Sequence, residues 1–201
     1  MCMNNNSPNI QTPNKNLAAW DGKQVDSLSN LKDRKIFLEV GTSDTTVGPN
    51  PMNALQTQLQ PYTTTDKTAY IKRSGQAHVF PTNFDGQGNN QCGSASSPYI
   101  ANCGYDGAGE VLKWMYGNLS PRASKAQGTF VTYDQSGKYG ALGMAQSGSL
   151  YVPKACQDGK TVCKLHVALH GCQQTMSAIG NKYTVNTGYN EWAGTWRCLK
   201  L

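Results

Sequence analysis

The chain has 201 residues, and its 18 lysines and arginines outnumber its 12 aspartates and glutamates, which gives a formal net charge of +6. Hydrophobic residues make up 38% of the sequence, enough at this length for one sizeable core. No stretch approaches the roughly 20 apolar residues of a membrane span, so no membrane association is expected. The basic residues stand singly or in pairs and form no cationic stripe, so nucleic acid is not an expected partner.

The seven cysteines indicate an oxidising compartment. Two pairs stand close together in polar, glycine-rich loops, Cys92 with Cys103 and Cys156 with Cys163, and each is predicted to form a disulfide. Free buried thiols are the alternative, but these loops offer little apolar cover. Residues 1–6 have neither the basic start nor the apolar centre of a signal peptide. We therefore expect a secreted protein whose natural N-terminus is not the one given.

The first half of the chain is predicted to contain one βαβ unit. The first thirty residues have a loop-like composition, and the apolar run 35–40 that follows is typical of a central parallel strand. A helix is expected over 51–60, with Pro51 in its first turn, and a second strand over 68–72. A strand, a helix and a strand in this order form a right-handed crossover.

The second half is predicted to mix helices and strands. A glycine- and asparagine-rich loop over 85–107 precedes a helix over 110–119. Three more strands are expected, over 130–133, 150–152 and 164–170. The last of these is expected to be buried, with the second cysteine pair closing a hairpin between the last two. The segment 176–192 is expected to be helical with loops, and 195–201 has no readable pattern. The fold class is α/β.

Polar side chains follow both strands of the βαβ unit. Asp44 comes just after the first strand, and His78 comes just after the second. Because catalytic groups of open α/β sheets gather at this carboxyl edge, the two side chains can meet there. Asp44 would then orient His78 and stabilise its protonated form, while His78 acts as general base. The ordinary alternatives are a turn or cap role for Asp44 and a surface position for His78.

The run 169–172 (Leu-His-Gly-Cys) predicts an oxyanion-binding loop. A strand that enters a glycine and a small residue can aim backbone N–H groups at a developing oxyanion, and the expected donor is the N–H of Cys172 or its neighbour. The matching nucleophile is absent, because no Gly-x-Ser-x-Gly elbow occurs in the chain. Ser147 is the nearest imitation, but it lacks the first glycine and precedes a strand.

Zinc binding is a rival interpretation of the same region. Four side chains of zinc-binding type lie within ten residues: Cys163, His166, His170 and Cys172. A rigid strand cannot wrap these four around one tetrahedral centre, and Cys163 is better used by Cys156. No metal is therefore expected.

Five segments together carry a recognisable set of motifs: 41–50, 75–82, 103–109, 165–174 and 188–193. They resemble the extracellular poly(3-hydroxybutyrate) depolymerases of the single-domain, circularly permuted α/β-hydrolase type. The resemblance runs from about Cys2 to Ala193. It implies that Asp44 and His78 match the triad acid and base, and that Cys172 matches an oxyanion-hole donor through its backbone N–H.

The order of these elements agrees with a circular permutation. An ordinary α/β hydrolase runs oxyanion loop, serine, acid, histidine, whereas here the acid and the histidine precede the oxyanion loop. In the permuted family the serine elbow comes first, and it has no counterpart in this chain. Beyond Ala193 the family pattern continues into another core strand, so 194–201 is expected to be an aberrant tail. We therefore expect residues 1–201 to form a single, incomplete α/β-hydrolase domain, truncated at both ends.

Three cysteines have no predicted partner within the chain. Cys2 and Cys172 are expected to pair with cysteines of the missing regions, and Cys198 is interpreted as an accident of the tail.

The resemblance implies a secreted, monomeric ester hydrolase that needs no cofactor. Its substrate would be a polyester polymer or a 3-hydroxybutyrate oligomer, cleaved by Ser-His-Asp acyl transfer. Because the serine is missing, the 201-residue chain itself is expected to be inactive. Two alternatives stay open: a non-catalytic polymer-binding protein that has kept the hydrolase scaffold, and an esterase for another acyl ester.

Overall fold

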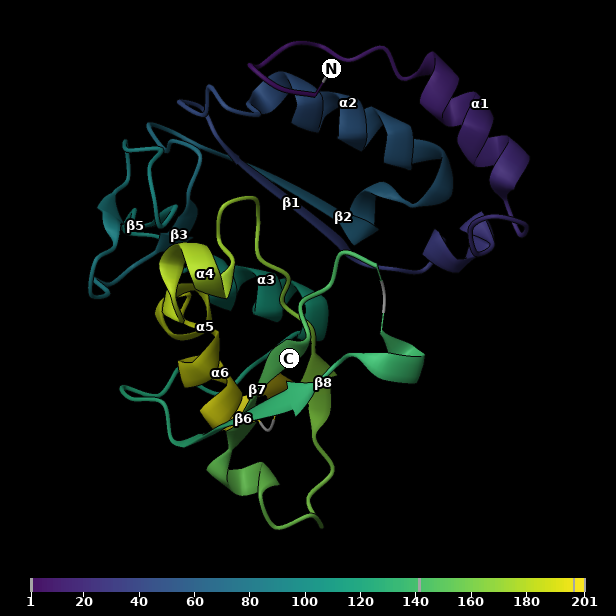
Figure 1. The fold of residues 1–201 in the computed structure, drawn as a ribbon. Coiled ribbons are helices and arrows are strands. Elements are labelled where there is room, and N and C mark those ends of the chain that lie inside the picture. The colour runs from purple at the N-terminus through teal and green to yellow at the C-terminus, as the bar shows by residue number, and fades with distance from the viewer. Residues whose placement is uncertain (1, 141, 197, 201) are drawn as a thin grey trace. The chain divides into compact units, whose positions relative to one another are not determined.

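The structure, a computed structural model, describes residues 2–140, 142–196 and 198–200 (Figure 1). The chain divides into two compact units. The first joins residues 1–81 with 90–103, and the second joins 82–89 with 104–201. Each unit is described by itself below.

The first unit contains the predicted βαβ unit. Strand β1 (Ile36–Gly41) leads into helix α2 (Pro49–Leu59) and then into strand β2 (Thr68–Arg73). The two strands are parallel, in register from Ile36 opposite Thr68 to Gly41 opposite Arg73. Helix α2 contacts β1, and the side chains of Leu38 and Val40 on this strand are buried. The periodicity of the sequence therefore predicted this part of the fold correctly.

The prediction of loops over the first thirty residues is wrong in part, because helix α1 spans Gln11–Trp20. Pro13 is tolerated there because it lies in the first turn, where its missing N–H breaks no helical hydrogen bond. None of the helix's residues is buried, and Trp20 stays 40% exposed. A helix that buries so little lacks the periodic apolar stripe by which sequence patterns identify helices.

Short elements complete the first unit. Three brief strands form a sheet in the order β3-β5-β4: β3 (Phe80–Thr82), β4 (Asn90–Gln91) and β5 (Ile100–Asn102). The predicted disulfide between Cys92 and Cys103 joins the residues that directly follow β4 and β5. Single turns of 3₁₀-helix lie at Leu28–Leu31, Gln60–Tyr62 and Thr65–Lys67. Two- and three-residue strands are too short to give a periodic signal, so the sequence indicated only a loop here.

The second unit begins its regular structure with helix α3 (Gly107–Tyr116). Its bounds lie three residues before the predicted ones, for a local reason at each end. The Asp106 carboxylate accepts the N–H of Gly109 at 2.9 Å and caps the helix N-terminus. Gly117, at a φ of 86°, ends the helix.

A four-stranded sheet in the order β6-β7-β9-β8 forms the other part of this unit. Its strands are β6 (Gly128–Asp134), β7 (Ser147–Pro153), β8 (Lys164–His166) and β9 (Cys198–Lys200). Strands β6 and β7 pair antiparallel over seven residues. The predicted hairpin between 150–152 and 164–170 is wrong, because β9 lies between β7 and β8. The Cys156–Cys163 disulfide therefore closes the connection between two strands that do not pair.

The predicted buried strand over 164–170 is also wrong. Strand β8 has only three residues, and the large apolar side chains along the segment are half-exposed or more: 52% for Leu165, 54% for Val167 and 77% for Leu169. An apolar run is buried only when other elements cover both of its faces, and the described elements leave about half or more of each of these side chains exposed.

Three helices follow in sequence: α4 (Met176–Ile179), α5 (Lys182–Asn186) and α6 (Tyr189–Trp196). The predicted helical segment with loops is thus confirmed, and its breaks fall at Gly180 and Gly188, both at positive φ. Two further 3₁₀ turns lie at Gly137–Tyr139 and Lys154–Cys156. Of the expected tail, 194–196 end α6 and 198–200 form β9, while 197, 201 and the side chain of Cys198 lie outside the description. None of the described helices is long and apolar enough to cross a membrane.

Candidate active site

Asp44 and His78 lie together at the carboxyl edge of the β1–β2 pair. The Asp44 carboxylate oxygen Oδ2 is 2.8 Å from His78 Nδ1. Asp44 follows β1 by three residues and His78 follows β2 by five, so the parallel register brings the two loops to the same edge. The Asp44 side chain is 7% exposed, whereas 40% of the His78 side chain faces solvent. A buried carboxylate thus holds an accessible imidazole.

Hydrogen bonds fix the charge state of this pair. Burial raises the pKa of Asp44, but hydrogen bonds from His78 and from the Val47 and Thr46 N–H groups outweigh it, and the net pKa is lowered. The hydrogen bond with Asp44 raises the pKa of His78, and burial opposes that rise only in part. Because an ionised Asp44 only accepts hydrogen bonds, it selects the tautomer with the proton on Nδ1. His78 Nε2 is then available to accept a proton.

The Asp44 loop is held from the N-terminal segment of the chain. Asn5 donates its N–H to the Val47 carbonyl at 2.9 Å, and the Asn50 N–H donates to Asn5 Oδ1 at 2.9 Å. The Asn50 amide nitrogen Nδ2 also donates to the Asn5 carbonyl, at 2.8 Å. Asn5 therefore ties the loop that carries Asp44 to the first turn of α2. Sequence patterns do not show this, because the bonded residues are 45 positions apart.

The His78 loop is anchored to β1 by a buried amide. Gln76 is only 2% exposed, and its Nε2 donates to the Glu39 carboxylate oxygen Oε1 at 2.7 Å. Burial raises the pKa of Glu39 to about 7, although the hydrogen bond from Gln76 and the charge of Arg73 oppose that rise. Sequence reasoning missed both residues. The one available signal was an acidic residue at the centre of an otherwise apolar strand.

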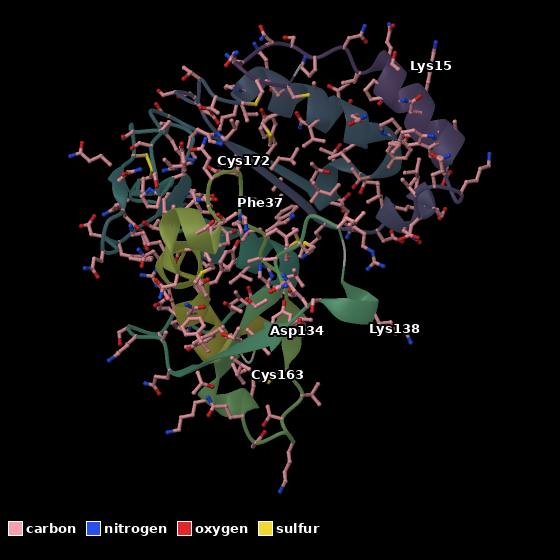
Figure 2. The ribbon with its side chains drawn as sticks, in the orientation of Figure 1. Lys15, Phe37, Asp134, Lys138, Cys163 and Cys172 are labelled. Carbon is pink, nitrogen blue, oxygen red and sulfur yellow. A yellow bond between two sulfur atoms is a disulfide. The ribbon has the colours of Figure 1, made fainter. Side chains whose placement is uncertain are left out.

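Cys172, the predicted oxyanion donor, belongs to the second unit, where it lies on the loop between β8 and α4 (Figure 2). The neighbouring N–H of Gly171 already donates to Gln174 Oε1 at 2.8 Å. Among the described residues, the N–H of Cys172 donates to no backbone carbonyl. The Tyr183 hydroxyl donates to the Leu169 carbonyl at 2.8 Å and braces the start of the loop. The Gly171 N–H is therefore already engaged within the loop.

The cysteines separate into bonded pairs and free thiols. Both predicted disulfides are formed, and Cys2 and Cys172 are free and exposed. Because Cys163 is bonded to Cys156, the four-residue zinc site considered from the sequence loses one of its ligands. Within the described residues, no three His, Cys, Asp or Glu side chains are placed to hold a metal ion.

Comparison with known proteins identifies the relatives of this chain. A polyhydroxybutyrate depolymerase from Talaromyces funiculosus is 51% identical over 195 residues, which are 96% of this chain and 58% of the relative. The crystal structure of a PHB depolymerase from Penicillium funiculosum matches the whole chain and 63% of its own, with a TM-score of 0.97 and 50% identity. The resemblance to polyhydroxybutyrate depolymerases is thus confirmed.

Two more matches agree with this result. A poly(3-hydroxybutyrate) depolymerase from Delftia acidovorans is 38% identical over 174 residues, 85% of this chain and 35% of the relative. A serine-to-alanine variant of a PHB depolymerase, solved in complex with an R3HB trimer, matches the whole chain and 63% of its own, with a TM-score of 0.96 and 50% identity. No protein-family model matches the chain.

These matches define the fold class and the extent of the likeness. The structural match and the mixture of helices and strands fit an α/β-hydrolase-like fold. The chain spans 58% and 35% of the lengths of the two curated depolymerases that it matches.

Proposed function

We propose that this chain supplies the acid and the base of a secreted ester hydrolase that cleaves 3-hydroxybutyrate polyesters or their oligomers. The observation that carries the proposal is the 2.8 Å contact between Asp44 Oδ2 and His78 Nδ1 at the carboxyl edge of two parallel strands. The similarity to depolymerases over 96% of the chain supports the substrate class. The two disulfides support an oxidising, extracellular location.

In the proposed mechanism, His78 Nε2 takes the proton of a serine hydroxyl as its oxygen attacks the ester carbonyl. Asp44 stabilises the resulting imidazolium, and the Cys172 N–H would donate to the oxyanion. His78 then gives this proton to the alkoxide oxygen of the breaking ester bond, so that the alcohol departs and a 3-hydroxybutyryl-serine ester remains. Finally His78 activates water, which releases the acid and restores the serine. No cofactor takes part in this sequence.

The nucleophile of this mechanism is proposed to be a serine outside residues 1–201, in a circularly permuted order of elements. Two facts support this. No serine in the chain stands in a Gly-x-Ser-x-Gly elbow, and the chain spans only 58% of its Talaromyces relative. In addition, the relative solved with the R3HB trimer is a serine-to-alanine variant.

A chimera tests the proposal. This chain would replace the aligned 195 residues of the Talaromyces depolymerase, and release of 3-hydroxybutyrate from an R3HB trimer would be measured. The chimera is expected to be active. Asp44→Asn and His78→Asn should each lower kcat/KM on the order of 10⁴-fold, whereas Ser147→Ala should leave it unchanged.

Two outcomes would contradict the proposal. One is a chimera with a native circular dichroism spectrum that releases no product. The other is turnover that survives loss of His78. A folded but inactive chimera that still binds polyester granules would instead support the non-catalytic binding protein.

A further inference from the structure

The buried Gln76 side chain anchors the loop that carries His78. Its Nε2 donates to Glu39 Oε1 at 2.7 Å and lies 3.4 Å from the Val79 carbonyl oxygen. Gln76 precedes His78 by two residues and Val79 directly follows it, so these bonds fix the backbone on both sides of the imidazole. The acceptor, Glu39, lies on β1, the strand that leads into the Asp44 loop.

The backbone of Gln76 touches the Asp44 loop directly. The Gln76 carbonyl accepts the N–H of Ser43, the residue before Asp44, at 3.0 Å. At the end of β1 the approach is so close that a Cβ on Gly41 would lie 2.0 Å from the Gln76 carbonyl oxygen. Only glycine fits there. The two loops therefore meet at Gln76, and a displacement of this residue would move His78 relative to Asp44.

Three polar groups act on the Glu39 carboxylate, and Gln76 is the one that hydrogen-bonds to it. They are the Gln76 amide, the Arg73 guanidinium and the Asp44 carboxylate. The charge of Asp44 disfavours ionisation of Glu39, whereas Gln76 and Arg73 favour it. Within the described residues, the other amide atom of Gln76, Oε1, is buried without a hydrogen-bond partner. Burying that oxygen costs free energy, so packing alone does not explain a glutamine here.

We propose that Glu39 and Gln76 are positioning residues, whose hydrogen bond holds the His78 loop in the register that lets His78 Nδ1 bond Asp44 Oδ2. The catalytic meaning of this pair rests on the function proposed above. The positioning itself does not, because the Asp44–His78 bond can be measured in a protein that has no activity.

The experiment is a histidine titration by ¹H–¹³C NMR on the 201-residue chain. The chain has three histidines, and the His78 signal is identified by its loss in His78→Asn. Three variants of similar side-chain volume are compared with the wild type: Glu39→Gln, Glu39→Met and Gln76→Met. Both Glu39 variants remove the same charge, but only Glu39→Gln keeps an oxygen that can accept the Gln76 bond. The difference between them therefore isolates the hydrogen bond.

A matched control removes another amide bond of the same unit. Gln58 Nε2 donates to Asn14 Oδ1 at 2.9 Å, so Gln58→Met loses a glutamine hydrogen bond that does not touch the His78 loop. Far-UV circular dichroism checks that each variant is folded.

We expect Glu39→Met and Gln76→Met to lower the pKa of His78 by about half a unit or more, toward its ordinary value, because the bond to Asp44 loosens. The pKa of His78 should be clearly higher in Glu39→Gln than in Glu39→Met. In Gln58→Met it should match the wild-type value. The proposal is overturned if His78 titrates alike in the two Glu39 variants, or if Gln76→Met matches Gln58→Met. Should one of the two positions not tolerate methionine, the comparison at the other decides.

Discussion

Glu39 makes a sharp prediction about how the stability of the first unit depends on pH. Burial raises the pKa of its carboxyl from 4.5 to about 7. The folded protein therefore binds this proton more tightly than the unfolded chain does. The resulting contribution to stability is fully present below pH 4.5 and is lost as the pH rises through about 7.

The size of the effect follows from the shift. One pKa unit corresponds to about 1.4 kcal/mol, so the whole shift corresponds to about 3.5 kcal/mol, of which about 2.5 kcal/mol falls between pH 5 and pH 8. Glutamine at position 39 keeps an oxygen that can accept the Gln76 bond but carries no proton to release. Relative to the wild type, Glu39→Gln should therefore gain about 2.5 kcal/mol of unfolding free energy between these two pH values.

Urea unfolding followed by tryptophan fluorescence, at pH 5 and at pH 8, measures this difference for each protein. Glu110→Gln is the control, because the Glu110 side chain is 42% exposed and pairs with Lys113 in a surface ion pair. It should change the pH dependence by less than about 0.5 kcal/mol. A stability difference between wild type and Glu39→Gln that is the same at both pH values would refute the reasoning.

Three further predictions concern the same unit. Asp44→Asn should lower the pKa of His78 toward its ordinary value of 6.5, because the hydrogen bond that raises it loses its charged acceptor; NMR titration measures this. In the wild type, the stabilisation from this pair is lost as the pH falls through the lowered pKa of Asp44 and as it rises through the raised pKa of His78. Asn5→Ala should cost about 1–2 kcal/mol and speed amide exchange at Asn50, because its N–H loses the acceptor Asn5 Oδ1, as hydrogen exchange would report. Replacing Cys92 and Cys103 together by alanine should cost about 2–3 kcal/mol in urea unfolding, since the disulfide closes a short loop. An unchanged midpoint in either of these last two variants would contradict its prediction.

The sequence was a good guide where the chain obeys a regular period. Strands β1 and β2 and helix α2 could be predicted because an apolar run, a helical stripe and a second apolar run follow one another. The parallel pairing then follows from the connection, and with it the meeting of Asp44 and His78 at one edge. Both disulfides could be predicted because their cysteines are 11 and 7 residues apart in loops.

The sequence was a poor guide where tertiary context decides. The run 164–170 contains four apolar residues, as β1 does, yet Leu169 is 77% exposed, because burial depends on what covers a strand and not on the strand alone. Strand β9 could not be placed between β7 and β8, since its three residues carry no pattern of their own. Helix α1 was missed for a different reason: it forms without burying any of its residues.

The residues that support Asp44 and His78 were hidden for a related reason. Asn5 and Gln76 act through bonds to partners 45 and 37 positions away, and no local pattern marks such pairs. They do, however, all lie in the first unit, as do Asp44 and His78 themselves. The acid, the base and both of their supports can thus form without the second unit supplying any of these contacts. The charge state and hydrogen bonding of the pair are therefore measurable properties of these residues, whether or not a serine is present to use them.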